Sequence, residues 1–151
     1  MTLVAVIDTN VLAAGLMTPR EEAPTAWIVE SMVTARFPFA LSIALLAEYS
    51  DVLHRKALRK RHGLADDEIE VLLASLARDA VVLEPAHGMV APDPGDQHIW
   101  DLLAAHDDLC LVTGDKLLLR HRPQPAAMLT PAEFKQRMTA PGVHESRSTR
   151  D

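Results

Sequence analysis

The sequence is poor in cysteine, in aromatic residues and in long apolar runs. Its single cysteine, Cys110, can form neither an intramolecular disulfide nor a zinc site built from cysteines, and we expect a reducing, cytoplasmic setting. Aromatic residues make up 4% of the chain, which is too few for a surface on which RNA bases stack. No stretch approaches the roughly 18 apolar residues of a membrane span. The N-terminal MTLVAVIDTN lacks the basic start and cleavage pattern of a signal peptide.

An overall excess of basic residues is also absent. The chain has 15 Lys and Arg against 21 Asp and Glu, a formal net charge of −6, which argues against a protein that coats nucleic acid through a general positive field. Residues 54–62, HRKALRKRH, are the exception, because they hold five basic residues and no acid. The remainder of the chain is therefore markedly acidic, and this segment is the one candidate for contacts with phosphate.

What is present is an alternation of apolar, β-branched runs with amphipathic segments. Residues 3–7, LVAVI, predict a strand buried on both faces, which is typical of a central parallel sheet. Further strands are predicted at residues 37–41, 81–83, 109–112 and 128–129. Helices are predicted at residues 11–16, 26–36, 66–80, 96–106 and 115–119, from Pro131 onward, and from the N-cap Ser42 to about Arg59, with Gly63 closing that last one.

This order of elements predicts an α/β fold, a three-layer α/β/α sandwich around a mainly parallel sheet. With 151 residues, 48% of them hydrophobic, the chain is long enough to build one core without metal or disulfide support. We expect one domain over residues 1–139. Residues 140–151, APGVHESRSTRD, are polar and unpatterned and are expected to form a flexible tail.

Four acidic residues are predicted to meet at one edge of this sheet, since ligands of open parallel sheets bind beyond the carboxyl ends of the strands. Asp8 and Asp115 follow two of the predicted strands. Asp96 opens a helix after a Pro/Gly-rich loop, and Glu48 lies about two turns into the helix after the second strand. Four carboxylates repel one another unless cations neutralise them.

The chemistry of these ligands favours hard divalent cations. Carboxylate oxygens, without paired cysteines or histidines beside them, suit Mg²⁺ or Mn²⁺. Two such ions can activate a water and stabilise the leaving oxygen of an in-line displacement, which is the chemistry of phosphodiester hydrolysis. No serine, cysteine or histidine nucleophile is then required.

Each acid also has a purely structural interpretation. Asp8, Asp96 and Asp115 stand where a helix cap is expected, Asp93 stands in a Pro-Gly turn, and Glu48 fits a solvated helix face. The seven histidines are scattered without an HxxxH pair, and we expect them to be solvated or to cap helices. The shared placement of the acids at strand ends and adjoining helix starts is what favours a common site.

Several motifs, in this order and spacing, resemble the PIN-domain family. They are Asp8-Thr9-Asn10 after the first strand, Glu48 in a helix, DPGDQHIW at residues 93–100, VTGDKLLL at 112–119 and LTPAEF at 129–134. More narrowly, they resemble the bacterial branch of VapC-like toxin components of toxin–antitoxin pairs. The resemblance covers about residues 1–138, and it depends on the whole set rather than on any single motif.

The resemblance implies a Mg²⁺- or Mn²⁺-dependent ribonuclease that cleaves RNA, that is often a homodimer, and that is inhibited by a cognate antitoxin. The acidic positions of the family match Asp8, Glu48, Asp96 and Asp115. Asn10 and Thr113 match as supporting polar groups, and Asp93 matches as an outer acid.

The third motif departs from the denser acidic run that some relatives carry. Here Gly95 and Gln97 interrupt the run. This leaves open whether Asp93 or Asp96 contacts the metal, and we favour Asp96 because a helix is predicted to begin there.

The basic segment fits the same interpretation. Arg55, Lys56 and Arg59 follow Glu48 at helical spacing, so they are expected to hold RNA phosphates beside the metal ions. The alternative is a solvated helix end whose cations offset the helix dipole.

We therefore expect a metal-dependent endoribonuclease in which an activated water attacks the phosphodiester. Two alternatives remain. One is a PIN-like module that binds RNA or a protein without cutting. The other is a phosphatase that forms an aspartyl-phosphate at Asp8, although such an enzyme would want a second Asp where Asn10 stands.

Overall fold

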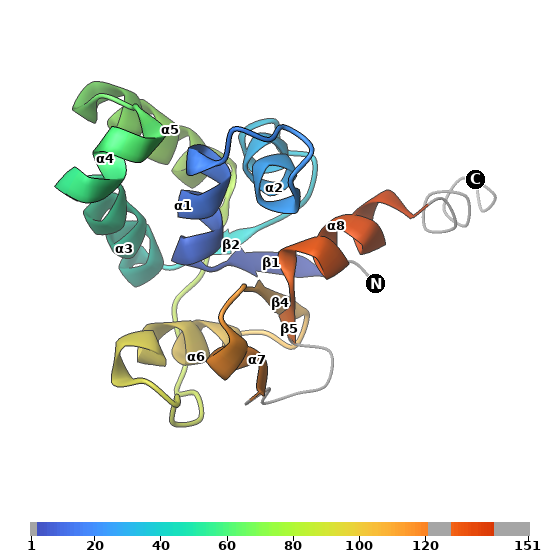
Figure 1. The fold of residues 1–151 in the computed structure, drawn as a ribbon. Helices are drawn as coiled ribbons and strands as arrows, with labels where there is room; N and C mark the ends of the chain where they lie inside the picture. The colour runs from blue at the N-terminus through green and yellow to red at the C-terminus, as the bar shows by residue number, and fades with distance from the viewer. Residues whose placement is uncertain (1–2, 121–127, 141–151) are drawn as a thin grey trace.

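In the computed structural model, which describes residues 3–120 and 128–140, short parallel strands lie between two groups of helices (Figure 1). The strands are β1 (Val4–Ile7), β2 (Ala40–Leu41), β3 (Val81–Val82), β4 (Leu109–Val112) and β5 (Met128–Leu129). β1, β4 and β5 form one sheet in the order β1-β4-β5, and β2 pairs with β3. A parallel bridge between Ala5 and Phe39 joins the two sheets, so the strand order across the molecule is β3-β2-β1-β4-β5.

The strand order reverses direction between β1 and β4. From β1 the chain builds outward through β2 and β3, and it then returns to add β4 and β5 on the opposite side of β1. Ile7 pairs with Val112 at the ends of these two strands, so the residues that follow, Asp8 and Thr113, leave the sheet side by side. In doubly wound sheets such a reversal opens a crevice at the carboxyl ends of the strands, where ligands bind.

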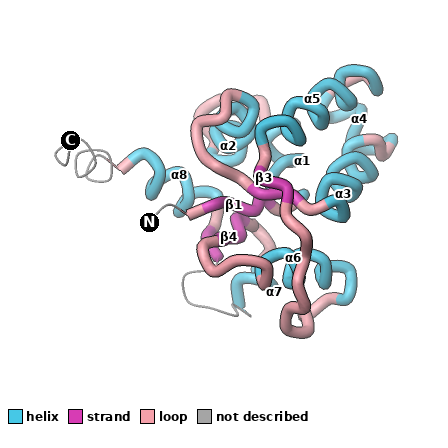
Figure 2. The backbone as a smooth tube through the Cα atoms, turned by 180° about the vertical axis from the view of Figure 1, so that it is seen from behind, coloured by secondary structure: helices cyan, strands magenta, loops and turns pink. Residues whose placement is uncertain are grey.

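Helices cover both faces of the strands, which confirms the predicted α/β/α sandwich with a parallel sheet. Figures 1 and 2 show α6 and α7 on the opposite side of the strands from α1, α2 and α8. The helices are α1 (Thr9–Met17), α2 (Pro24–Val33), α3 (Ile43–Leu53), α4 (Lys56–His62), α5 (Asp66–Asp79), α6 (Gln97–Leu103), α7 (Lys116–Arg120) and α8 (Pro131–Thr139). A short 3₁₀ turn, η1 (Pro94–Asp96), precedes α6.

The strands that carry the candidate site lie deep in the core. Every residue of β4 is buried, including Cys110, and so are three of the four residues of β1. A strand apolar on both faces is what a parallel sheet between two helical layers requires. The rigid core therefore fixes the positions at which β1 and β4 end.

The single long helix predicted from Ser42 to about Arg59 is wrong. The chain forms α3 and α4, and Arg55 between them has an extended backbone with ψ 133°. The ring of His62 donates to the carbonyl oxygen of Leu53 at 2.9 Å, which satisfies a group that α3 leaves without a partner at its end. Gly63 closes α4 in the left-handed conformation, as expected.

Smaller differences concern the ends of elements. α1 begins already at Thr9, and α6 ends at Leu103 instead of continuing to His106. The predicted strand at 81–83 is reduced to β3, whose two valines are exposed. Within the described ranges, no helix is long and apolar enough to cross a membrane. Residues 141–151, most of the predicted tail, lie outside the described residues, and the domain boundary at 139 stays a prediction.

Candidate active site

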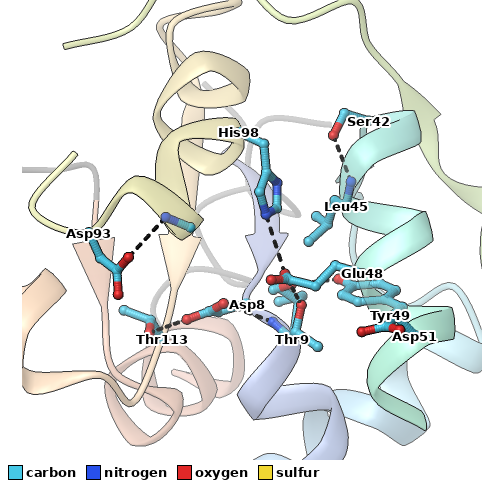
Figure 3. Close-up of polar contacts among 12 residues, drawn as sticks. Asp8, Thr9, Ser42, Leu45, Glu48, Tyr49, Asp51, Asp93, His98 and Thr113 are labelled. Carbon is cyan, nitrogen blue, oxygen red and sulfur yellow. Dashed lines mark hydrogen bonds and ion pairs between the residues drawn. The ribbon is translucent and has the colours of Figure 1, made fainter. Parts of the chain in front are cut away.

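Asp8 is a buried carboxylate held by neutral donors at the end of β1. Its side chain accepts one hydrogen bond from the backbone N–H of Thr9 at 2.9 Å and one from the hydroxyl of Thr113 at 2.7 Å (Figure 3). The residue is 7% exposed. Burial raises the pKa of Asp8; the two hydrogen bonds act in the opposite sense, and the charges of Glu48 and Asp115 raise it further.

Glu48 extends from α3 toward the end of β1. Its Oε2 accepts a hydrogen bond from the Thr9 hydroxyl and lies 3.4 Å from Nε2 of His98 (Figure 3). The next residue, Tyr49, is fully buried, and its hydroxyl donates to the carbonyl oxygen of Ile7 at 2.5 Å. Burial, followed by the charges of Asp8 and Glu48, raises the pKa of Tyr49 well above its ordinary value. The hydrogen bond of Tyr49 therefore holds α3 against the end of β1, and this places Glu48 beside the end of that strand.

Asp96 lies among the other acids, and its side chain makes no hydrogen bond or ion pair with any residue that the structure describes. It occupies the N-cap position of α6, yet its side chain makes no capping hydrogen bond, so the structure does not support a purely capping role. Burial raises the pKa of Asp96 to about 6, and the charges of Asp8, Asp93, Asp115 and Glu48 add to that shift. The carboxylate therefore experiences all the other candidate acids at once.

Asp93 and Asp115 each form a local structural bond. Oδ1 of Asp93 accepts from the backbone N–H of Gly95 at 2.9 Å, so this exposed residue caps η1. Oδ1 of Asp115 accepts from the backbone N–H of Leu117 at 2.8 Å at the start of α7. Its charge nevertheless raises the pKa of both Asp8 and Asp96, which places it electrostatically in the same group.

Other predicted residues lie apart from the acids. Asn10 is exposed on the first turn of α1, and its side chain makes no hydrogen bond within the described part of the chain. The guanidinium groups of Arg55 and Arg59 pair with Asp51 and Asp66 at 3.1 and 3.3 Å, in exposed positions. Because the helix breaks at Arg55, the basic residues do not continue the helix face that carries Glu48.

The basic residues of α4 instead border an open hollow of their own. The hollow has a volume of about 430 Å³. Its lining residues are Lys56, Arg59, Lys60, Gly63, Leu64 and Ala65.

Two residues beside the acids did not stand out in the sequence. His98, the second residue of α6, faces Glu48 of α3. Gln97, which stands where the acidic run is interrupted, fastens the preceding loop to α6. Its carboxamide accepts from the backbone N–H of Ala91 at 2.9 Å and donates to the carbonyl of Met89 and to Asp101, each at 3.0 Å. In the sequence, the only indication of a role for Gln97 and His98 was that they directly follow Asp96.

The donor set fits a hard divalent cation. Four carboxylates from separate segments influence one another, and within the described residues the cationic groups form no ion pair with Asp8, Asp96 or Asp115. Across those same residues, no three His, Cys, Asp or Glu side chains already stand at metal-ligating spacing. A bound cation would therefore draw these side chains closer together, and it would relieve the repulsion that raises the pKa of Asp96.

The molecule is thus an α/β protein whose candidate acids lie where the order of the parallel strands reverses. The sequence profile of the PIN domain matches residues 4–117, so the chain belongs to the PIN domain family, which has a nuclease-type fold and typically uses divalent metal ions. Among curated proteins, none matches the chain. The chain is similar to a solved structure described as the T. brucei RRP44 PIN domain, with 15% identity and a TM-score of 0.49, over 99% of this chain and 88% of that one.

Proposed function

We propose that this protein is a Mg²⁺- or Mn²⁺-dependent endoribonuclease whose active site is formed by Asp8, Glu48, Asp96 and Asp115. The observation that supports the proposal is the gathering of acids from separate segments at the reversal point of the sheet, where burial, and after it the charges of the neighbouring acids, raises the pKa of Asp96 to about 6. When bound, the divalent cation supplies an activated water for attack on the phosphodiester and stabilises the leaving oxygen.

The four acids have different degrees of freedom in this site. The carboxylate of Asp8 is held in place by hydrogen bonds from Thr9 and Thr113, so we expect it to keep its position when a cation binds. Asp115 commits one oxygen to the start of α7 and keeps the other for a cation. Among the described residues Asp96 has no side-chain hydrogen bond to lose, so it is the ligand that can move most readily, and we favour it over the capping residue Asp93.

RNA has to be attracted by residues outside the acidic crevice, because its phosphates and the four carboxylates carry the same sign. The basic segment at Arg55, Lys56 and Arg59 supplies that attraction in our proposal. The hollow bordered by Lys56, Arg59 and Lys60 is large enough to take part of a phosphate backbone. The choice of RNA over DNA follows from the family resemblance of the motifs.

The finer biological role that we propose is that of the VapC-like toxin in a bacterial toxin–antitoxin pair, acting in the cytoplasm as a homodimer that a cognate antitoxin inhibits. The resemblance of the motifs at residues 8–10, 93–100 and 112–119 supports this role. The gene immediately upstream tests it. A small reading frame with a DNA-binding start and an amphipathic end supports a toxin, and its absence favours a nuclease that acts alone.

The direct test of the proposed activity is the variant Asp8→Asn. We expect it to abolish cleavage of single-stranded RNA in Mn²⁺ while keeping the fold, because asparagine has the same shape and can still accept from Thr9. The exposed acid Asp107, which lies in the turn before β4, is changed to Asn in the same way as the matched control and is expected to cut normally.

Undiminished cleavage by Asp8→Asn would remove Asp8 from the site and overturn the assignment. Wild-type protein that binds RNA and fails to cut it, in Mn²⁺ as in EDTA, would favour the PIN-like binding module instead. A phosphorylated Asp8 would indicate the phosphatase, which lacks its second acid because Asn10 stands in that place.

A further inference from the structure

The contact between His98 and Glu48 links the two helices that border the crevice. We infer that His98 is a positioning residue, which together with Thr9 determines which oxygen of Glu48 is presented to the cation. This inference rests on the proposed function, since it concerns the same acidic site. Asp96 lies two residues before His98 in the chain, so the contact ties the segment of Asp96 to the helix of Glu48.

Thr9 and His98 both contact the same oxygen of Glu48. The Thr9 hydroxyl donates to Oε2, and Nε2 of His98 lies 3.4 Å from that same atom. Across the described residues, Oε1 takes part in no hydrogen bond or ion pair. A hydrogen bond from Thr9 and the close approach of His98 on Oε2 restrict the rotation of the carboxylate and leave Oε1 to face a cation, as polar partners orient metal-ligating carboxylates in proteins.

The contact turns one ring nitrogen of His98 toward Glu48. Nε2 is the nitrogen that faces Oε2, and a carboxylate oxygen can accept from an N–H at that position. Nδ1 is buried and has no hydrogen-bond partner among the described residues. A solvated surface histidine or a helix cap would use Nδ1 or expose it, whereas here the ring turns Nε2 to Glu48.

The test separates a donor role from a merely structural one. His98→Gln keeps an N–H that reaches about as far as Nε2, and His98→Leu keeps bulk without a donor. His98→Asn, whose amide is shorter, replaces the leucine variant if leucine disturbs the fold. The matched control is the exposed His106 after α6, changed to Leu.

The main readout is the dissociation constant for Mn²⁺ in the absence of RNA, followed by paramagnetic resonance of the free ion. We expect His98→Leu to weaken Mn²⁺ binding by roughly 10–100-fold, the usual effect of losing a partner of a metal ligand. His98→Gln should restore most of that loss, and His106→Leu should bind as the wild type does. In RNA cleavage, the kcat of His98→Leu should be lower than that of the wild type at limiting Mn²⁺ and should return to the wild-type value in excess Mn²⁺. The KM for RNA should stay unchanged.

A second variant asks whether His98 acts through Glu48. In a Glu48→Ala background, which has no side-chain acceptor at this position, His98→Leu should cause no further loss of Mn²⁺ affinity, because the interaction that it removes is already gone. An additive loss in the double variant would overturn the inference, and so would equal defects in His98→Gln and His98→Leu.

The outcomes also distinguish this inference from the proposed function. If the wild type neither binds Mn²⁺ nor cuts RNA, both fall together. If the wild type does both and His98→Leu binds Mn²⁺ equally well, the positioning role alone is overturned.

Discussion

At the scale of single residues, the acids of the site combine structural and electrostatic roles. Asp8 caps α1 with one oxygen and accepts from Thr113 with the other, and Asp115 caps the start of α7. Capping and metal binding favour the same residue types at the same strand and helix ends, so the sequence alone could not separate them. The structure shows that Asp8 and Asp115 accept backbone N–H groups at helix starts while their charges also act on the neighbouring acids, and it shows no capping bond for Asp96.

The contact of His98 could not be predicted from the sequence. Its contact with Glu48 joins residues 50 positions apart in the chain, on two different helices. Nothing in the spacing of the histidines indicated it, because only the packing of α6 beside α3 brings the two side chains together. Asp8 and Thr113 were more accessible to prediction, since each directly follows a buried apolar strand.

The raised pKa of Asp96 predicts how the stability of the metal-free protein depends on pH. The folded state holds the proton up to a pKa of about 6, against an ordinary value of 3.8, so the folded state binds it more tightly than the unfolded one. The contribution of the protonated Asp96 to the free energy of unfolding is fully present at pH values below the ordinary pKa of 3.8. It is lost as the pH rises through about 6. We expect Asp96→Asn, denatured with urea in EDTA, to be more stable than the wild type at pH 7 and less sensitive to pH over this window.

Asp101 provides the comparison of opposite sign. Hydrogen bonds from Gln97 and from the backbone of Gly88 lower the pKa of Asp101. Its carboxylate therefore stabilises the fold at pH values above the ordinary pKa of an aspartate, and this effect is lost as the pH falls. Asp101→Asn should therefore destabilise the protein at pH 7. A destabilised Asp96→Asn with the pH profile of the wild type would contradict the assignment of Asp96 to the acidic group.

At the scale of elements, the strands were predictable and the break between α3 and α4 was not. Continuous apolar runs indicated β1 and β4, because burial on both faces leaves no polar position in a short strand. The break depends on the ring of His62 reaching back to Leu53, nine residues earlier, and helical periodicity contains no such information. The order of the strands likewise depends on long-range pairing that local patterns do not encode.

The end of α2 contains a strained alanine that a glycine should relieve. Ala35 has φ 53°, in the left-handed region, while the backbone N–H of Arg36 donates to the carbonyl of Ser31 at 2.8 Å and closes the helix. We expect Ala35→Gly to raise the free energy of unfolding by about 1 kcal/mol, the typical cost of a left-handed L-residue. Ala74→Gly, exposed within α5, should lower it by about 1 kcal/mol. Urea midpoints measure both, and a loss of stability in Ala35→Gly would show that this end is not strained.

The separate helix α4 predicts a specific salt dependence of RNA binding. Replacing Arg55, Lys56 and Arg59 by Ala should weaken binding uniformly across RNA sequences and flatten its dependence on salt, because phosphate contacts release counterions. Two of these cations already pair with Asp51 and Asp66, so Lys56→Ala alone should account for a large share of the effect. Affinities of a cleavage-inactive Asp8→Asn background at several salt concentrations provide the measurement. An unchanged slope would return the segment to the role of a solvated helix end.

At the scale of the whole molecule, the basic segment and the candidate metal ligands occupy different places in the fold. A net charge of −6 coexists with one basic segment, while the candidate ligands gather where the strand order reverses. The acidic crevice repels RNA on its own, and a divalent cation would turn it into a site that attracts phosphate. The account therefore depends most on one claim, that Asp8, Glu48, Asp96 and Asp115 share a cation.

Thermal melts of the wild type and of Asp96→Asn, each in EDTA and in Mn²⁺, test that claim most directly. A ligand that binds only the folded state stabilises it by mass action, by about 2.7 kcal/mol at 100 times its dissociation constant. We predict that Mn²⁺ raises the Tm of the wild type clearly and that of Asp96→Asn much less, while Asp96→Asn melts above the wild type in EDTA. Equal responses to Mn²⁺, with Asp96→Asn melting below the wild type in EDTA, would contradict a shared metal site.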